Sequence, residues 1–408
     1  MAPDILVALA SMGLLALAVV ARRLADSWLF PPALFSAVWA GNLVFSLVVH
    51  YGDLSITPPA LLVFLTGAVL FASTGIGLWL GRGLERAAPA LPRERSVFMR
   101  RIILAYSIGL IVLFPFYLQA IRNAIAQLSI EDLASGARTV TMGGDIRLVP
   151  RYFQSLLSIG GALTLLMAWL YDGSRRDRLL LALSLGSWLA NIVLALGRTP
   201  VFVLVIGVGS ILAFRRKISL VAAIVGLALT AVAAIAMGSV LGKGLDLSTH
   251  TSLVEAVARN LGVYFVGGPV GFAHVMDRPT RVGELGLSLR LFTQALQSFG
   301  YSISLPNNIL GFDTTDLGNV YTMYFAYWLD WAWWGVAAVG IAAGAFATWL
   351  YIAARRGNPI AGVGLGIAFP ALLNSATGDG LFGSSIPWIL IVLIVGSLWR
   401  SPWPRSTS

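Results

Sequence analysis

Long apolar runs separated by short polar connections follow one another along nearly the whole chain. An α-helix rises about 1.5 Å per residue, so about 20 apolar residues cross a bilayer core of about 30 Å. The runs that approach or exceed this length are Ile5–Ala21, Pro32–Val49, Ala60–Leu80, Ile102–Ala120, Phe153–Tyr171, Leu179–Leu196, Pro200–Phe214, Ile218–Leu241, Trp331–Ala353, Ile360–Ala376 and Ile386–Trp399. The pattern predicts an all-α, polytopic integral membrane protein with about eleven transmembrane helices.

Composition agrees with this pattern. The 408 residues are 58% hydrophobic and only 11% charged, which is fewer charges than a soluble domain of this size carries. The chain has no cysteine, which excludes disulfides, thiolate metal sites and a cysteine nucleophile. Asp4 precedes the first run, and Arg22 and Arg23 follow it. We therefore interpret this run as a span and not as a cleaved signal peptide.

The basic residues concentrate in every second connection. Eighteen of the 28 Lys and Arg lie there: at 22–23, within 82–101, at 175–178, at 215–217, at 355–356, and at 400 and 405. Short loops rich in Lys and Arg stay in the cytoplasm. This rule predicts an N-terminus outside and a C-terminus in the cytoplasm. It also accounts for the net charge of +10 without a nucleic-acid partner.

Two segments on the outer side are longer than simple connections, 121–152 and 242–330. The second contains two amphipathic stretches, Ser252–Phe265 and Leu287–Phe299, and is interrupted by prolines such as Pro269. We expect these stretches to lie along the outer interface of the membrane and to cover what is beneath them. The chain is expected to form a single membrane domain that carries these two loops.

Helix lengths predict where the backbone enters the membrane from outside. Arg178 and Arg198 are 20 residues apart, about 30 Å of helix, which places Arg198 at the outer boundary or slightly below it. Ser385 and Arg400 are only 15 residues apart, about 22 Å, so the turn 378–385 also lies below the surface. Irregular backbone at this depth is tolerated inside protein or beside water. The two turns predict a cavity that opens to the outer face.

Three short motifs follow one another in the second half of the chain. Gly197-Arg198-Thr199 opens a span, Tyr-Phe-Val-Gly-Gly-Pro at 264–269 lies in the long outer segment, and Asn319-Val320-Tyr321-Thr322 precedes Asp330. From Leu179 to Arg356 this order resembles the bacterial O-antigen polymerases, the Wzy-type family of oligosaccharide repeat-unit polymerases. An arginine-x10-glycine pattern of some members is matched only by Arg198 and Gly209, and Gly209 lies inside a span.

The resemblance implies a multi-pass glycosyltransferase of the bacterial inner (cytoplasmic) membrane with a GT-C-like fold. Such enzymes join oligosaccharide units carried on undecaprenyl pyrophosphate at the periplasmic face, and the product is O-antigen, capsule or exopolysaccharide. The outer segments are then periplasmic, no metal or other cofactor takes part, and a polysaccharide chain-length regulator is an expected partner. The sequence has no Walker motif or glycine-rich phosphate loop, as expected for a lipid-activated donor.

The implied reaction displaces a pyrophosphate from an anomeric carbon, and arginines stabilise the charge that develops on the phosphate oxygens. Arg198 is the first candidate for this role. Other candidates for contacts with the pyrophosphate or the sugars lie at the outer ends of spans or on the long outer segment: Arg147, Arg151, Arg259, Arg290, Asn319, Tyr321 and Tyr264. The alternative for each arginine is an interfacial or solvated charge without a substrate.

A general base would remove the proton of the attacking sugar hydroxyl. The candidates are Asp330 in a tryptophan-rich stretch, Asp379 in the glycine-rich turn, and His274 in the long outer segment. Each has a structural alternative. Asp330 can cap the helix that follows it, Asp379 can stabilise its own turn, and His274 can be a packed histidine.

Two other functions fit the same topology. A ligase that transfers finished O-antigen to lipid A shares the long periplasmic loop and uses a histidine there, for which His274 is the candidate. A polysaccharide transporter or flippase carries paired charges or broken helices at the membrane midplane. Here the polar residues at that depth are few, such as Asn42, Asn191 and Asn374, and the charges crowd towards the faces. The polymerase is therefore the preferred interpretation.

Overall fold

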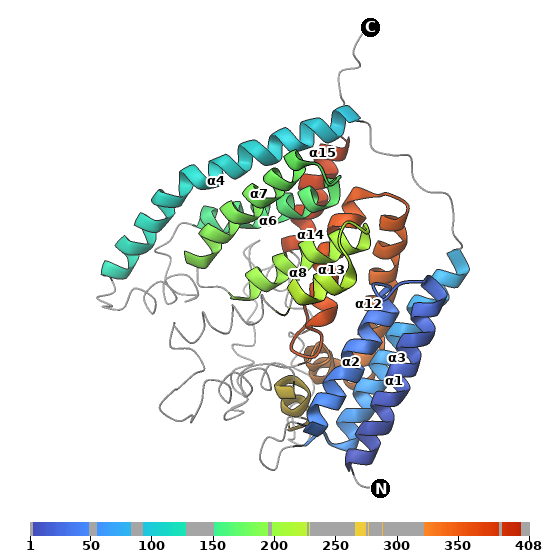
Figure 1. Ribbon diagram of the computed structural model, residues 1–408. Coiled ribbons are helices and arrows are strands. Elements are labelled where there is room, and N and C mark those ends of the chain that lie inside the picture. The colour runs from blue at the N-terminus through green and yellow to red at the C-terminus, as the bar shows by residue number, and fades with distance from the viewer. Residues whose placement is uncertain are drawn as a thin grey trace. The chain divides into compact units, whose positions relative to one another are not determined.

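The computed structural model describes residues 3–48, 55–82, 93–127, 151–194, 198–226, 228, 266–274, 276, 288, 322–382 and 386–400. These residues form helices, turns and bends, and no strand occurs among them. The helices are α1 (Pro3–Ala25), α2 (Pro31–Val48), α3 (Pro58–Arg82), α4 (Arg93–Gln127), α6 (Arg151–Leu170), α7 (Arg175–Leu194), α8 (Arg198–Phe214), α12 (Phe325–Arg355), α13 (Pro359–Leu373), α14 (Ile386–Leu390), the π-helical η2 (Ile391–Val395) and α15 (Gly396–Arg400) (Figure 1).

Five of the described helices are long enough and apolar enough to cross a membrane: Asp4–Ala25, Pro31–Val48, Pro58–Arg82, Arg95–Ala126 and Phe325–Arg355. Shorter apolar helices cover Ser155–Leu170, Pro200–Phe214, Pro359–Leu373 and Trp388–Leu398. The predicted all-α membrane class is confirmed. The number of eleven spans and their orientation stay predictions, and of the predicted span Ile218–Leu241 only its first part is described, as helix at 220–226.

The helix α4 is longer than the sequence pattern predicts. It runs from Arg93 to Gln127, so the first residues of the predicted outer loop 121–152 are helical. Ile121, Ala124 and Ile125 are buried, with the spacing i, i+3, i+4 that places them on one face of a helix. This apolar face continues the helix past the predicted end. Residues 128–150 of that loop lie outside the described residues, and 151–152 belong to α6.

Contacts divide the chain into two compact units, where the sequence predicts one membrane domain. The first comprises 1–85, 244–352 and 368–385, and the second comprises 86–243, 353–367 and 386–408.

In the first unit, aromatic side chains hold the ends of three helices together. Phe30, in the connection after α1, contacts Trp79 of α3 at 5.4 Å and Tyr351 of α12 at 5.5 Å between ring centroids. The indole Nε1 of Trp79 donates to the carbonyl of Leu24 at 3.3 Å. The C-terminal ends of α1, α3 and α12 therefore meet, as expected if their basic termini share one side of a membrane.

Glycines allow α12 to pack closely on α3. A Cβ at Gly344 would overlap the backbone of Phe71, and a Cβ at Gly340 would lie 2.9 Å from the carbonyl oxygen of Gly67. Gly67 in turn accommodates the ring of Tyr324. Small residues at Gly340 and Gly344 thus permit the close approach of the two helices.

In the second unit, polar side chains of α7 fasten it to the backbones of α6 and α4. The indole Nε1 of Trp188 donates to the carbonyl of Leu157 at 2.8 Å, and the side-chain amide of Asn191 donates to the carbonyl of Leu110 at 3.2 Å. These donors sit inside apolar helices, where an unpaired N–H is costly. Each therefore fixes how its helix packs against the next.

Candidate functional site

The helix α12 is broken at Ala332. This residue has φ 49° and ψ −132°, a conformation that an L side chain rarely adopts and that costs about 1–3 kcal/mol. Gly335 follows one turn later, and a Cβ there would overlap the backbone carbonyl of Tyr327. The break thus folds Gly335 against the residues before it. It falls next to Trp331, where the sequence predicts that the membrane span begins.

Asp330 lies immediately before this break and is only 6% exposed. Its Oδ2 accepts hydrogen bonds from the backbone N–H of Ser288 at 2.7 Å and from the Ser288 hydroxyl at 2.5 Å. The indole Nε1 of Trp331 donates to the same hydroxyl oxygen at 3.1 Å. Among the described residues Asp330 thus binds the long outer segment and does not cap the helix that follows it. A buried carboxylate needs such donors to remain inside the protein.

Asp379 reaches α12 from the turn that follows α13. Its Oδ2 accepts a hydrogen bond of 2.6 Å from the hydroxyl of Tyr327. Its Oδ1 accepts from the backbone N–H groups of Leu381 at 3.1 Å and Phe382 at 2.9 Å. The structural role predicted for Asp379, stabilisation of its own turn, is therefore confirmed, and the same side chain also contacts α12.

Tyr327 brings the two carboxylates into one cluster. The Tyr327 hydroxyl donates a hydrogen bond to Asp379, and the charges of Asp379 and Asp330 both act on this hydroxyl. Tyr327 and Asp330 are three residues apart on a helix, which places them on one face. We call Asp330, Tyr327, Asp379 and Ser288 the carboxylate cluster. It joins two of the three residues that the sequence proposes as general bases.

Three segments far apart in the chain meet behind this cluster. The helical segment 266–274 packs on the turn after α13, because a Cβ at Gly268 would overlap the carbonyl of Ala376. The backbone N–H of Met323 donates to the carbonyl of Ser375 at 2.8 Å. The ring of Phe272 contacts Phe325 at 6.5 Å and Trp328 at 6.3 Å. The first unit thus assembles parts of the long outer segment, α12 and the glycine-rich turn.

The third base candidate, His274, ends the described part of this segment and is half-buried. Pro269, predicted to interrupt structure here, lies within the helix and does not end it.

The arginine candidates are described only in part. Arg198 is the first residue of α8 and Arg151 is the first residue of α6, and their side chains lie outside the described residues. The same holds for the whole of Arg147, Arg259, Arg290, Asn319, Tyr321 and Tyr264. The predicted pyrophosphate site, and the cavity at the outer face, therefore stay predictions.

Two members of the carboxylate cluster were not foreseen. Tyr327 carries a usable signal, because it stands three residues before Asp330 and so shares its helix face. No local sequence signal identifies Ser288, because it contacts Asp330 from a position 42 residues earlier in the chain. Only tertiary packing selects it among the serines of the long outer segment.

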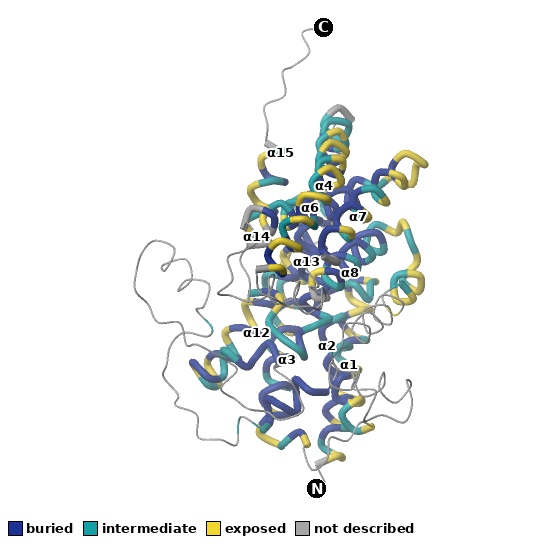
Figure 2. The backbone as a smooth tube through the Cα atoms, turned by 90° about the vertical axis from the view of Figure 1, so that its left-hand side faces the viewer, coloured by how far each residue is buried: buried dark blue, intermediate teal, exposed yellow. Residues whose placement is uncertain are grey.

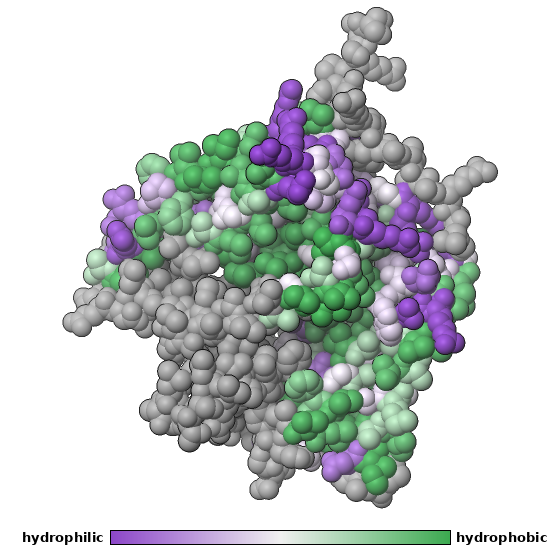
Figure 3. Space-filling model, in the orientation of Figure 1, coloured by the Kyte–Doolittle hydropathy of each residue, from purple (hydrophilic) through white to green (hydrophobic). Residues whose placement is uncertain are grey.

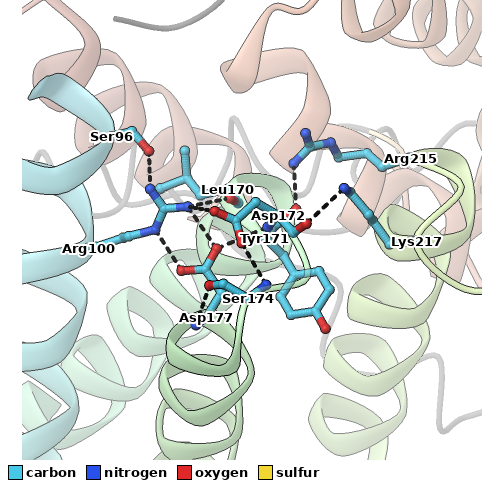
Figure 4. A network of polar contacts seen from close by, with 9 residues as sticks. All are labelled: Ser96, Arg100, Leu170, Tyr171, Asp172, Ser174, Asp177, Arg215 and Lys217. Carbon is cyan, nitrogen blue, oxygen red and sulfur yellow. Dashed lines mark hydrogen bonds and ion pairs between the residues drawn. The ribbon is translucent and has the colours of Figure 1, made fainter. Parts of the chain in front are cut away.

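A second polar network lies in the second unit (Figure 4). Arg100 binds both carboxylate oxygens of Asp177, at 2.8 and 2.7 Å, and also the carbonyl of Leu170 at 2.9 Å. Arg215 donates to the carbonyl of Tyr171 at 3.3 Å. These residues come from the start of α4, from the end of α6 and the connection and first turn of α7 that follow it, and from the residue after α8. Their meeting is expected if their basic connections share one side of a membrane.

The charges of this network are satisfied within it. The Asp177 side chain is 2% exposed and is fully engaged by Arg100. Lys217 donates to the carbonyl of Asp172 at 3.1 Å. Hydrogen bonds from Ser174 hold the pKa of Asp172 below its ordinary value. We therefore interpret the network as structural, because its cations are committed to protein acceptors.

The described residues contain no group of three or more His, Cys, Asp or Glu side chains that could hold a metal ion. Comparisons with protein-family models, with curated proteins and with solved structures find no match for this chain.

Proposed function

We propose that this protein is a bacterial inner-membrane glycosyltransferase that polymerises oligosaccharide repeat units carried on undecaprenyl pyrophosphate at the periplasmic face. The observation that carries the proposal is the carboxylate cluster, in which Tyr327 donates a hydrogen bond to Asp379 and shares a helix face with Asp330, just before the break in α12. The cluster includes residues of the segment that resembles the O-antigen polymerases. Strained backbone and paired acidic groups concentrate at functional sites.

Within the cluster we assign the general base to Asp330. The Oδ1 of Asp379 is bonded to its own turn and its Oδ2 to Tyr327. Among the described residues, both hydrogen bonds that Asp330 accepts go to Oδ2, and we propose that Oδ1 receives the proton of the incoming hydroxyl. Asp379 then acts as a positioning residue, because it holds Tyr327 and the turn against α12. Ser288 fixes the orientation of the Asp330 carboxylate in the same way.

The proposed reaction is a displacement at the anomeric carbon of the donor. The acceptor hydroxyl oxygen forms the new glycosidic bond while its proton passes to Asp330. The bond between the anomeric carbon and the pyrophosphate oxygen breaks, and undecaprenyl pyrophosphate leaves with the bonding electrons. Arg198, supported by Arg147, Arg151, Arg259 or Arg290, stabilises the charge on the leaving group.

The test uses purified protein and a synthetic undecaprenyl-pyrophosphate-linked repeat unit, with product length measured on a gel. Asp330→Asn keeps the shape of the side chain but cannot take up the proton, so elongation should fall at least about a hundredfold. Asp4→Asn is the control, since Asp4 is an exposed carboxylate in the first turn of α1. Polymer of normal length and rate from Asp330→Asn would remove the cluster from the mechanism.

Lipopolysaccharide banding in cells separates the polymerase from the two alternatives. Loss of a polymerase leaves core capped with a single repeat unit, whereas loss of a ligase leaves uncapped core. Elongation by the purified protein in detergent excludes a function in transport alone, because no second compartment is present.

A further inference from the structure

The surface of α4 is the least covered among the five long apolar helices. In the most apolar 18-residue stretch of α4, only 22% of the residues are buried, against 33–56% in the corresponding stretches of the other four helices. Large apolar side chains such as Ile108, Val112 and Phe116 are exposed by 49%, 58% and 61%. Figure 2 shows α4 largely in the colours of intermediate and exposed residues, and Figure 3 shows a hydrophobic surface along it. In a membrane protein such a surface faces lipid.

A groove of about 390 Å³ lies on this surface. It is lined by Ala105, Tyr106, Gly109, Leu110 and Leu113 of α4 and by Leu156 of α6. The one polar side chain in this lining, Tyr106, donates its hydroxyl to the carbonyl of Leu156 at 2.7 Å. The polar atom is thus satisfied by the protein. The volume falls within the range of about 300–1,000 Å³ found for ligand pockets.

The groove has an arginine at one end. Arg101, Ala105 and Gly109 are spaced four residues apart, so they form one row along α4. Arg101 is exposed, and the described part of the chain offers it no hydrogen bond or ion pair. Its neighbour Arg100 is committed to Asp177. Arg101 is therefore the cation placed to receive an anion at the end of an apolar groove.

We propose that this groove binds one acyl chain of an anionic phospholipid, with the lipid phosphate on Arg101. The apolar lining fits a hydrocarbon chain, and a guanidinium can bind a phosphate through two hydrogen bonds. The sequence predicts this end of α4 to be cytoplasmic, and the cytoplasmic leaflet carries anionic lipid. The proposal depends on the membrane class of the protein and not on its proposed reaction.

Gly109 offers a direct test, because a Cβ added there meets nothing within 4 Å. Gly109→Leu should therefore place a branched side chain in the groove, because Gly109 lines the groove and its Cβ position is open. Gly186 of α7 is equally open and lies outside the groove lining, so Gly186→Leu is the matched control. Titration of phosphatidylglycerol against each protein, read by native mass spectrometry, should show weaker binding for Gly109→Leu and unchanged binding for Gly186→Leu.

Arg101 gives a second, independent arm that leaves the helix packing intact. Arg101→Ala should weaken phosphatidylglycerol binding about fivefold, and phosphatidylcholine with the same chains should bind the wild-type protein more weakly. Equal affinity for the two lipids, or unchanged binding in both Gly109→Leu and Arg101→Ala, would overturn the proposal. Displacement of phosphatidylglycerol by equimolar undecaprenyl phosphate would also overturn it, since the occupant would then be the carrier lipid.

Discussion

The hydroxyl of Tyr327 donates a hydrogen bond of 2.6 Å to Oδ2 of Asp379, and this contact joins α12, just before its break, to the turn after α13. Fifty-two residues separate the two side chains. The same tyrosine also lies within the electrostatic reach of Asp330. Loss of the Tyr327 hydroxyl therefore removes the hydrogen bond that holds Asp379 on α12.

Tyr327→Phe removes this hydrogen bond and keeps the ring. Loss of one buried hydrogen bond costs about 1 kcal/mol of stability, which should leave the protein folded. Elongation of the lipid-linked repeat unit should nevertheless fall about tenfold or more, because Asp379 loses its contact with α12. Ser11→Ala is the control, since it also removes one buried hydrogen bond, of 2.9 Å to the carbonyl of Ala40. Equal activity of the two variants would contradict a role for Tyr327.

Ser288→Ala should reduce activity less than Asp330→Asn does, because the backbone N–H of Ser288 still donates to Asp330. The two changes share one hydrogen-bonded pair, so their effects on activity should not add in the double variant. The measurement is the elongation rate of wild type, both single variants and the double variant. Strictly additive effects would show that Ser288 does not act through Asp330.

Gly335→Ala should destabilise the protein by about 1–3 kcal/mol, because the added methyl group overlaps the carbonyl of Tyr327. Gly77→Ala in α3 meets nothing within 4 Å and should be neutral or slightly stabilising. The melting temperatures of the Gly335→Ala and Gly77→Ala variants in detergent compare their stabilities. Ala332→Gly should raise stability by relieving the positive φ at the break, and a lower melting temperature for this variant would argue against strain there.

Asp177→Ala should be strongly destabilising, by about 3–5 kcal/mol, because the Arg100 guanidinium, only 15% exposed, loses its two short bonds to a carboxylate and keeps only the longer ion pair with the exposed Asp172. Asp172→Ala should cost less than about 1 kcal/mol, since that carboxylate is 60% exposed and its ion pair with Arg100 is longer, at 3.4 Å. Thermal unfolding of the two variants compares them. A similar loss of stability in both would contradict the dominant role of the Arg100–Asp177 pair.

The lowered pKa of Asp172 gives a pH dependence of known sign. A carboxyl group whose pKa is lower in the folded protein stabilises the fold above its ordinary value of 3.8. That contribution is lost as the pH falls through the folded-state pKa. Asp172→Asn lacks this contribution at every pH, so it should be slightly less stable than wild type at neutral pH. As the pH falls, the variant should begin to unfold at the same pH as wild type or at a higher one.

The membrane class could be predicted from the chain, but only part of the candidate site could. Asp330 and Asp379 are identifiable as outer-side acids near predicted span ends, and Tyr327 follows from Asp330 by helical spacing. The sequence does not identify the contact of Ser288 with Asp330 or the packing of Gly268 on Ala376, because these contacts connect segments separated by long stretches of chain. The hydrophobic pattern also ends α4 too early, because Arg122 and Asn123 interrupt the apolar run, although one helix face stays buried as far as Ile125.

Hydrophobic patterning is enough to predict an all-α membrane protein, because backbone groups in a bilayer must be bonded within helices and the apolar runs are long enough for this. Which polar side chains meet depends on the packing of segments that are distant in the chain. The hydrogen bond from Tyr327 to Asp379 joins α12 to the turn after α13, and the close packing of Gly268 on Ala376 brings the segment 266–274 to the same turn. Such contacts depend on how distant segments pack, and neither hydrophobic periodicity nor charge pattern encodes that arrangement locally.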